Sequence, residues 1–280
     1  MWNGIGGKTA ESTGLFPDRV APAGLRRAIV LLAAWLVAAA ASARAPQVVD
    51  VPTRPGVTQR FLYVPAKAPV AAAILFAGGH GGLEIRPDGE IGWGRGNFLV
   101  RTRALFAERG ISVAVIDAPS DRQADPWLGG FRQTREHAAD AAAVVEWLRA
   151  ETTLPVWLVG TSRGTQSVAY LALASIGADG LVLTSTILVD PRGRPVPAMP
   201  VERIAVPTLV VHHRDDRCSV TPYSQASALA ARLTSSPRKA FLTFDGGTDR
   251  GDACEAAGHH GFAGIEVRVV DAIAAFVAGR

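Results

Sequence analysis

The chain has 280 residues, 48% of them apolar, which is enough to bury the core of one α/β domain or two small ones and excludes a disordered protein. Its formal net charge is +4, of which residues 1–43 contribute +2. No cluster of lysine and arginine with interleaved aromatic residues follows position 44, so the composition argues against a nucleic-acid partner.

The N-terminal 43 residues are typical of an export signal. Arg26 and Arg27 precede the apolar run 28–41, and Ala41-Ser42-Ala43 has the small-x-small form of a cleavage site. The run is shorter than the roughly 20 apolar residues of a membrane span. We predict a signal peptide over residues 1–43 and a periplasmic or secreted mature protein without stable membrane insertion; a translation start downstream of Met1 is an alternative. An uncleaved anchor is the alternative.

Strand-like and helix-like segments alternate along the remaining chain, 44–280. Continuous apolar runs are typical of strands buried on both faces, and apolar residues three or four positions apart are typical of helices. The expected strands are 47–51, 60–64, 71–76, 111–116, 156–160, 180–187, 207–212 and 240–244. The expected helices are 98–109, 134–149, 166–174, 224–233 and 265–277. This order predicts a single α/β domain in which helices cover both faces of a mostly parallel sheet.

The helix expected over 134–149 has the clearest pattern. His137 lies off its apolar stripe, and we expect a solvated side chain there and not a ligand. The stripe consists of Ala138, Ala141, Ala142, Val145 and Leu148.

A Gly-x-Ser-x-Gly sequence joins the strand 156–160 to the helix that follows it. A sharp strand-to-helix turn holds its central residue in a strained conformation and needs small residues two positions before and after it. Gly160 and Gly164 meet this need, so Ser162 Oγ would be exposed beside the N–H groups of a helix N-terminus. The pattern predicts that Ser162 is a nucleophile; a plain turn with an incidental serine is the alternative.

A serine nucleophile needs a base within hydrogen-bond reach, and the base needs a third group to orient it. In one known arrangement of such a triad, the acid and then the base follow the serine in the chain. Asp216, after the seventh strand, is the predicted acid, with Asp215 second and Asp190 third. His260, before the last helix, is the predicted base because a glycine and an aromatic residue follow it; His259 is the alternative.

The same two loops could instead bind zinc. Neighbouring residues on an extended chain point to opposite faces, so each pair supplies about one ligand, and no helical His-x3-His spacing is present. We therefore expect no metal and no cofactor. The residues weighed for such a site are His212, His213, Asp215, Asp216, His259 and His260.

The glycine-rich loop 77–82 follows the third strand. An oxyanion hole needs backbone N–H donors aimed at the developing charge. The N–H groups of Arg163 and Gly79 are the predicted donors, with His80 as the alternative to Gly79. We also expect His80 and Trp93 to contact the substrate, although Trp93 could equally be a packing residue.

Together, the strand order, the glycine-rich loop, the Gly-Thr-Ser-Arg-Gly turn, the Asp-Asp loop and the late Gly-His-His-Gly-Phe resemble the α/β-hydrolase superfamily over about residues 46–280. The resemblance implies the α/β-hydrolase fold and a triad of Ser162, Asp216 and His260. Two features depart from many members. Arg163 is a bulky cation where a neutral residue is common, and the connection 187–206 lacks a large helical lid, so we expect a small or absent lid.

These features predict an exported serine hydrolase that cleaves an ester, or a similar acyl bond, through an acyl-enzyme on Ser162. Its predicted partner is a small-molecule acyl substrate reached through an open cleft. Two alternatives remain: an acyltransferase with the same triad, and a non-catalytic binding protein with the same fold. The sequence predicts neither the substrate nor the oligomeric state.

Two cysteines, Cys218 and Cys254, lie in the predicted exported part. A pair of cysteines in an oxidising compartment predicts a disulfide. Cys218 follows Asp216 by two residues and Cys254 precedes His260 by six, so the bridge would join the two loops if a triad forms. Two free thiols in a reducing cytoplasm are the alternative.

Overall fold

The computed structural model describes Met1 and residues 45–280. The predicted signal peptide and its cleavage site lie, apart from Met1, outside the described residues. Within the described part, no helix has both the length and the apolar character that a membrane span requires.

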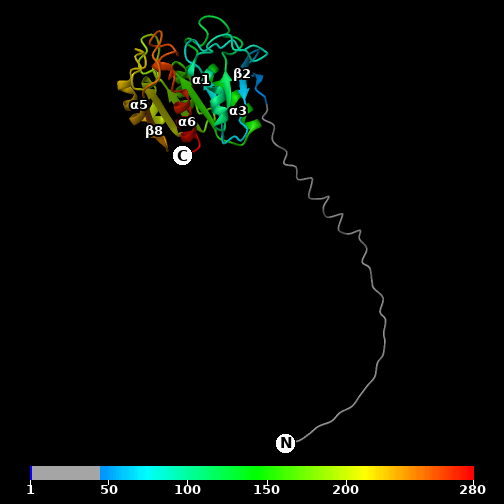
Figure 1. The fold of residues 1–280 in the computed structure, drawn as a ribbon. Helices are drawn as coiled ribbons and strands as arrows, with labels where there is room; N and C mark the ends of the chain where they lie inside the picture. The colour runs from blue at the N-terminus through cyan, green and yellow to red at the C-terminus, as the bar shows by residue number, and fades with distance from the viewer. Residues whose placement is uncertain (2–44) are drawn as a thin grey trace. The chain divides into compact units, whose positions relative to one another are not determined.

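The described residues form an eight-stranded sheet in the order β1-β2-β4-β3-β5-β6-β7-β8. The strands are β1 (Gln47–Pro52), β2 (Thr58–Val64), β3 (Ala71–Phe76), β4 (Ile111–Ile116), β5 (Val156–Thr161), β6 (Gly180–Thr184), β7 (Thr208–His213) and β8 (Lys239–Phe244). Strands β3 to β8 run parallel, whereas β2 pairs antiparallel with both β1 and β4. In Figure 1, β2 and β8 lie toward opposite ends of this sheet. The predicted mostly parallel sheet is confirmed.

Helices cover both faces of the sheet. They are α1 (Phe98–Arg101), α2 (Arg103–Glu108), α3 (Arg135–Glu151), α4 (Gly164–Leu173), α5 (Ala226–Arg232) and α6 (Glu266–Val277). Helices α1, α2 and α6 pack on one face, and α3, α4 and α5 pack on the other. This layering is the one that strand-helix alternation predicts.

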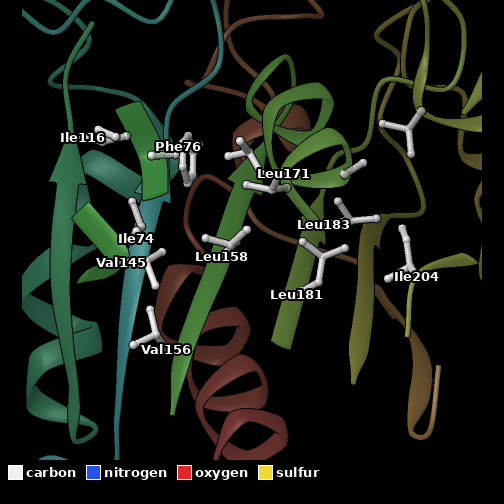
Figure 2. Packing of buried hydrophobic residues seen from close by; sticks show 14 of the residues in the cluster. Ile74, Phe76, Ile116, Val145, Val156, Leu158, Leu171, Leu181, Leu183 and Ile204 are labelled. Atoms are coloured by element: carbon white, nitrogen blue, oxygen red, sulfur yellow. The ribbon is translucent and has the colours of Figure 1, made fainter. Parts of the chain in front are cut away.

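The two faces of the central strands supply two apolar clusters. Ile74 and Phe76 of β3 point into the cluster shown in Figure 2, while Leu75 points into the cluster on the opposite face. Each of these side chains is at most 1% exposed, and burying a side chain of this size stabilises the fold by about 1.5–3 kcal/mol. The sheet centre is therefore a rigid support for the loops at its carboxyl edge.

Two expected elements differ from the sequence pattern: one helix is divided and one strand is shorter. The helix expected over 98–109 divides into α1 and α2 at Thr102, whose hydroxyl donates to the Phe98 carbonyl at 2.7 Å and competes with regular helix geometry. The sixth strand stops at Thr184 because Ser185 turns the chain with a φ of 43°. Both departures come from local hydrogen bonds or turns that apolar periodicity does not report.

His137 corrects the expectation of a solvated side chain. It is 2% exposed, on the buried face of α3, and its ring packs against the rings of Phe76 and Phe131. Neither ring nitrogen has a hydrogen-bond partner among the described residues. The buried face of α3 therefore includes the side that contacts these two aromatic rings, and the apolar stripe expected from the sequence does not include that side.

Replacing His137 with phenylalanine is expected to reduce the acid sensitivity of the fold. Burial, together with the charges of Arg132 and Arg54, lowers the pKa of His137 to about 3. The unfolded chain therefore takes up a proton near pH 6.5 that the folded chain rejects until about pH 3. This difference removes about 2 kcal/mol from the free energy of unfolding between pH 7 and pH 5.

Urea unfolding of both proteins at pH 7 and pH 5 measures this effect. The wild type should lose about 2 kcal/mol more than His137→Phe over that interval. His212, whose pKa burial lowers to about 4, contributes equally in both proteins and so cancels. An equal loss in the two proteins would show that His137 does not stay neutral in the folded state.

Candidate active site

Ser162 lies at the sharp turn between β5 and α4, with a φ of 51°. A left-handed conformation costs a residue other than glycine about 1–3 kcal/mol and is concentrated at functional sites. A Cβ at Gly164 would lie 2.0 Å from the Phe76 carbonyl oxygen, and one at Gly160 would lie 2.6 Å from the Gly164 carbonyl oxygen. The turn therefore requires both glycines, as the Gly-x-Ser-x-Gly pattern predicts.

His260 and Asp216 come together from loops that are 44 residues apart in the chain. The His260 Nδ1 atom lies 3.0 Å from the Asp216 Oδ2 atom. His260 belongs to a short 3₁₀ turn, His259–Gly261, whose main chain is held from two sides. The Ser185 hydroxyl donates to the His260 carbonyl at 2.7 Å, and Arg101 Nη2 donates to the Gly261 carbonyl at 2.6 Å.

Asp216 is stabilised as a carboxylate. Burial by itself would raise the pKa of Asp216, but the hydrogen bond and charge of His260, together with the Cys218 N–H and the Thr221 hydroxyl, lower it below the ordinary value. The Cys218 N–H donates to Oδ1 at 2.9 Å, and Thr221 Oγ1 donates to Oδ2 at 2.8 Å. An ionised carboxylate in this position can orient the imidazole and stabilise its protonated form.

The other candidate acids and the other histidine lie outside this contact. Asp190 accepts from Arg163 Nη1 at 3.0 Å. The Asp215 carbonyl lies 3.2 Å from His259 Nδ1, and the His259 ring stacks on His213 with centroids 4.2 Å apart. Among the predicted acids and bases, the structure therefore joins Asp216 to His260 and leaves the alternatives outside that contact.

Ser162 and His260 line the same cavity, which has a volume of about 590 Å³. The His260 Nε2 atom is buried and has no hydrogen-bond partner in residues 45–280. The hydrogen bond between Ser162 Oγ and Nε2 is therefore not formed in this conformation. Such bonds are often long without substrate and tighten only when the substrate is bound.

The glycine-rich loop presents a free backbone donor beside Ser162. Gly79 has a φ of 59°, and a Cβ there would lie 2.5 Å from the Trp93 ring, so only glycine fits. The N–H groups of Gly79 and Arg163 donate to no other group in the described part of the chain. Two such free donors near a nucleophile can bind an oxyanion.

The segment directly after the glycine-rich loop is anchored by Asp117, which sequence reasoning missed. Asp117 accepts backbone N–H groups from Leu83 at 2.6 Å, Ile85 at 2.8 Å and Ala118 at 2.7 Å. Burial raises the pKa of Asp117, and these donors only partly offset the rise. Its position directly after a buried strand was the available signal, because such residues lie at the carboxyl edge of the sheet.

Trp93 and His80, the residues expected to contact substrate, are in contact with each other. Their ring centroids are 3.6 Å apart, and Trp127 packs on the same imidazole at 4.9 Å. Trp93 lines the Ser162 cavity, whereas His80 lines a neighbouring one. The His80 Nδ1 atom accepts the Gly82 N–H at 3.1 Å, which holds the imidazole in place.

Three of the six residues considered as zinc ligands lie close together. Ligand atoms of His213, Asp215 and His259 are within 4.8 Å of one another. However, His213 already accepts the Asp215 N–H through Nδ1 at 3.1 Å, and its Nε2 lies 2.8 Å from the Gly246 carbonyl. A metal would have to displace one of these bonds, so the absence of a metal stays our prediction.

The structure contains the predicted Cys218–Cys254 disulfide. Cys218 is 1% exposed and follows Asp216 in the acid loop, and Cys254 lies in the loop that leads to His260. The bridge therefore limits how far the carboxylate can move from the imidazole. A misplacement of about 1 Å in a catalytic group can reduce the rate roughly 100-fold.

Removing this disulfide is expected to lower the free energy of unfolding by roughly 3.5–4 kcal/mol, because the bond closes a loop of 36 residues. In the Cys218→Ser/Cys254→Ser double variant, Tm should fall by roughly 8–15 °C. Thermal unfolding with and without dithiothreitol measures the change, and the reductant should not affect the double variant. Two reactive thiols in denatured, unreduced wild type would contradict this prediction.

Solved structures share this fold at low sequence identity, whereas no protein-family model and no curated protein matches the chain. An α/β serine hydrolase without lid from Xanthomonas campestris matches with a TM-score of 0.57 and 18% identity, over 82% of this chain and 94% of its own. Est1E from Butyrivibrio proteoclasticus, with ferulic acid bound, matches with a TM-score of 0.57 and 15% identity, over 82% of this chain and 98% of its own. A puromycin-hydrolyzing peptidase from Mycobacterium tuberculosis matches with a TM-score of 0.58 and 18% identity, over 88% of this chain and 40% of its own.

This chain thus has the α/β-hydrolase fold. Its connection between β6 and β7 contains two 3₁₀ turns, Val196–Ala198 and Val201–Arg203, in place of a helical lid. The predicted fold class and the small or absent lid are confirmed.

Proposed function

We propose that this protein is an exported serine hydrolase that cleaves an ester, or a similar acyl bond, of a small molecule. The observation that carries the proposal is that His260, hydrogen-bonded to buried Asp216, lines the same cavity as the strained Ser162. A nucleophile, a base and an orienting acid in this arrangement are the requirements for acyl transfer through a covalent intermediate.

In the proposed reaction, Ser162 Oγ attacks the substrate carbonyl carbon while its proton passes to His260 Nε2. The N–H groups of Gly79 and Arg163 donate to the resulting oxyanion, each contributing about 2.7–4 kcal/mol to transition-state stabilisation. The intermediate collapses when the C–O bond to the leaving alcohol breaks and His260 returns the proton to that alcohol. Water then attacks the acyl-enzyme by the same route and releases the acid. Asp216 stays ionised throughout and supports the imidazolium.

Export is supported by the disulfide and by the leader-like sequence before residue 44. A bond of this kind persists in oxidising compartments such as the periplasm. The open connection between β6 and β7 leaves the cavity accessible to a small or medium substrate.

A panel of p-nitrophenyl esters of increasing acyl length, assayed on residues 44–280, tests the proposal. We expect saturable hydrolysis, a burst of p-nitrophenol under pre-steady-state conditions, and labelling of Ser162 by a fluorophosphonate. Added alcohol should not divert most of the product into a new ester, because that outcome indicates an acyltransferase. Failure of both hydrolysis and labelling would contradict the enzymatic assignment and favour a binding protein.

A further inference from the structure

A second cavity, of about 560 Å³, adjoins the Ser162 turn and is strongly basic. It shares Gly79 with the first cavity. Its lining contains the side chains of four arginines but a single carboxylate, that of Asp190. The arginines are Arg132, Arg163, Arg192 and Arg194.

Arg132 is the buried cation of this cavity. It is 6% exposed, and it donates to neutral groups: the Ser167 hydroxyl at 3.0 Å and the carbonyls of Ala77 and Gly79, each at 3.2 Å. Within residues 45–280, no carboxylate forms a salt bridge with it. Burial and the nearby charge of Arg163 lower the pKa of Arg132 to about 9. A buried charge without a counterion is costly, and a bound anion would offset that cost.

The remaining charges of the cavity do not cancel. Asp190 neutralises Arg163 through the 3.0 Å pair between Oδ2 and Nη1. Arg192 and Arg194 are exposed and form no salt bridge with a described residue, and Arg194 Nε donates instead to the Gln133 amide oxygen at 2.6 Å. The cavity thus has three more cationic than anionic side chains, and guanidinium groups can bind a planar anion through paired N–H donors.

The position of this cavity relative to the reacting atoms indicates which part of a substrate would enter it. His260 returns a proton to the leaving group, so the leaving group lies on the His260 side, in the first cavity. The second cavity is lined by the two residues of the proposed oxyanion hole but by neither Ser162 nor His260. It therefore lies on the acyl side of the scissile bond.

We propose that the second cavity binds a carboxylate at the far end of the acyl group, so that the preferred substrates are monoesters of dicarboxylic acids. This inference rests on the proposed hydrolase function for the direction of the acyl group. Arg132, Arg192 and Arg194 supply the electrostatic attraction, and Arg132 also fixes the loop that carries the Gly79 N–H. Binding of the distal carboxylate is thereby coupled to the position of the oxyanion donor.

The test compares two methyl esters that differ in one terminal group: methyl hydrogen adipate, with a carboxylate, and methyl adipamate, with a neutral amide of the same shape. Hydrolysis is followed by methanol release, and the readout is the ratio of the two kcat/KM values. We expect wild type to favour the carboxylate at least about tenfold. Arg192→Gln/Arg194→Gln should abolish most of that preference, because it removes two of the cationic side chains of the cavity while Arg132, which holds the Gly79 loop, is kept. Arg203→Gln removes one positive charge outside both cavities and should keep the wild-type ratio.

A binding measurement separates failure of this inference from failure of the proposed function. Calorimetric titration of Ser162→Ala with methyl hydrogen adipate should show binding that the added Arg192→Gln/Arg194→Gln changes weaken about tenfold or more. If wild type hydrolyses no ester but this binding persists, the anion site stands and the hydrolase assignment is wrong. Equal binding and equal hydrolysis of the carboxylate and amide compounds would overturn the anion site. A preference for hexanoate esters with a carboxylate on the alcohol would overturn its placement on the acyl side.

Discussion

Replacing Ser162 with alanine is expected to lower kcat for ester hydrolysis by a factor on the order of 10⁶, while the fold stays intact. The hydroxyl is the proposed nucleophile, and the remaining oxyanion donors can give only a small residual rate over water. The change removes one oxygen at a residue that already has a φ of 51°, so the backbone of the turn does not need to move.

The measurement is steady-state hydrolysis together with thermal unfolding of wild type and Ser162→Ala. Ser175→Ala is a matched control, since Ser175 also has a left-handed φ, 55°, follows the same helix α4 and lines neither cavity. The control should keep wild-type turnover. If Ser162→Ala retained more than a few per cent of wild-type kcat, Ser162 would not be the nucleophile.

Alanine at His260 is expected to cost nearly as much as alanine at Ser162, roughly 10⁶-fold in kcat, because the residues of a triad act as a unit. His259→Ala should change kcat little. The physical reason is that the His260 imidazole, and not that of His259, is bonded to the buried Asp216 carboxylate at 3.0 Å. The His259 ring instead stacks on His213.

The two histidine variants serve as each other's controls, since they remove the same group from adjacent positions in one short turn. Thermal unfolding shows whether either variant disturbs that turn. A larger loss of kcat at position 259 would reverse the assignment of the base.

Local sequence signals were enough to predict the architecture. Runs such as 71–76 and 156–161 are apolar on both faces because their strands are covered by helices on both sides of the sheet. The Gly-x-Ser-x-Gly pattern lies within five residues and can be recognised without the fold, although the contact that requires Gly164 comes from Phe76, which is distant in the chain. Apolar runs and short motifs are contained in consecutive residues, so the sequence records them directly.

The pairing of the loops was less accessible from the sequence. The chain order of Ser162, Asp216 and His260 indicated candidates, but the acid and the base each came from a doublet of identical residues, and the pattern does not distinguish the members of a doublet. The structure distinguishes them by hydrogen bonds between loops 44 residues apart. Thr221, which donates to the same carboxylate, has no sequence signal because its role comes from the path of the loop.

By itself, the sequence determined the α/β order, the strained turn at Ser162 and the pair of cysteines, since each depends on local backbone geometry, apolar periodicity or composition. Only the tertiary structure decided that His137 is buried between aromatic rings and that Arg132 lies without a carboxylate in a basic cavity. The burial of a side chain and the net charge around it both depend on many residues that are distant in the chain. A histidine or arginine on a helix or loop has the same local pattern whether it faces water or the protein interior.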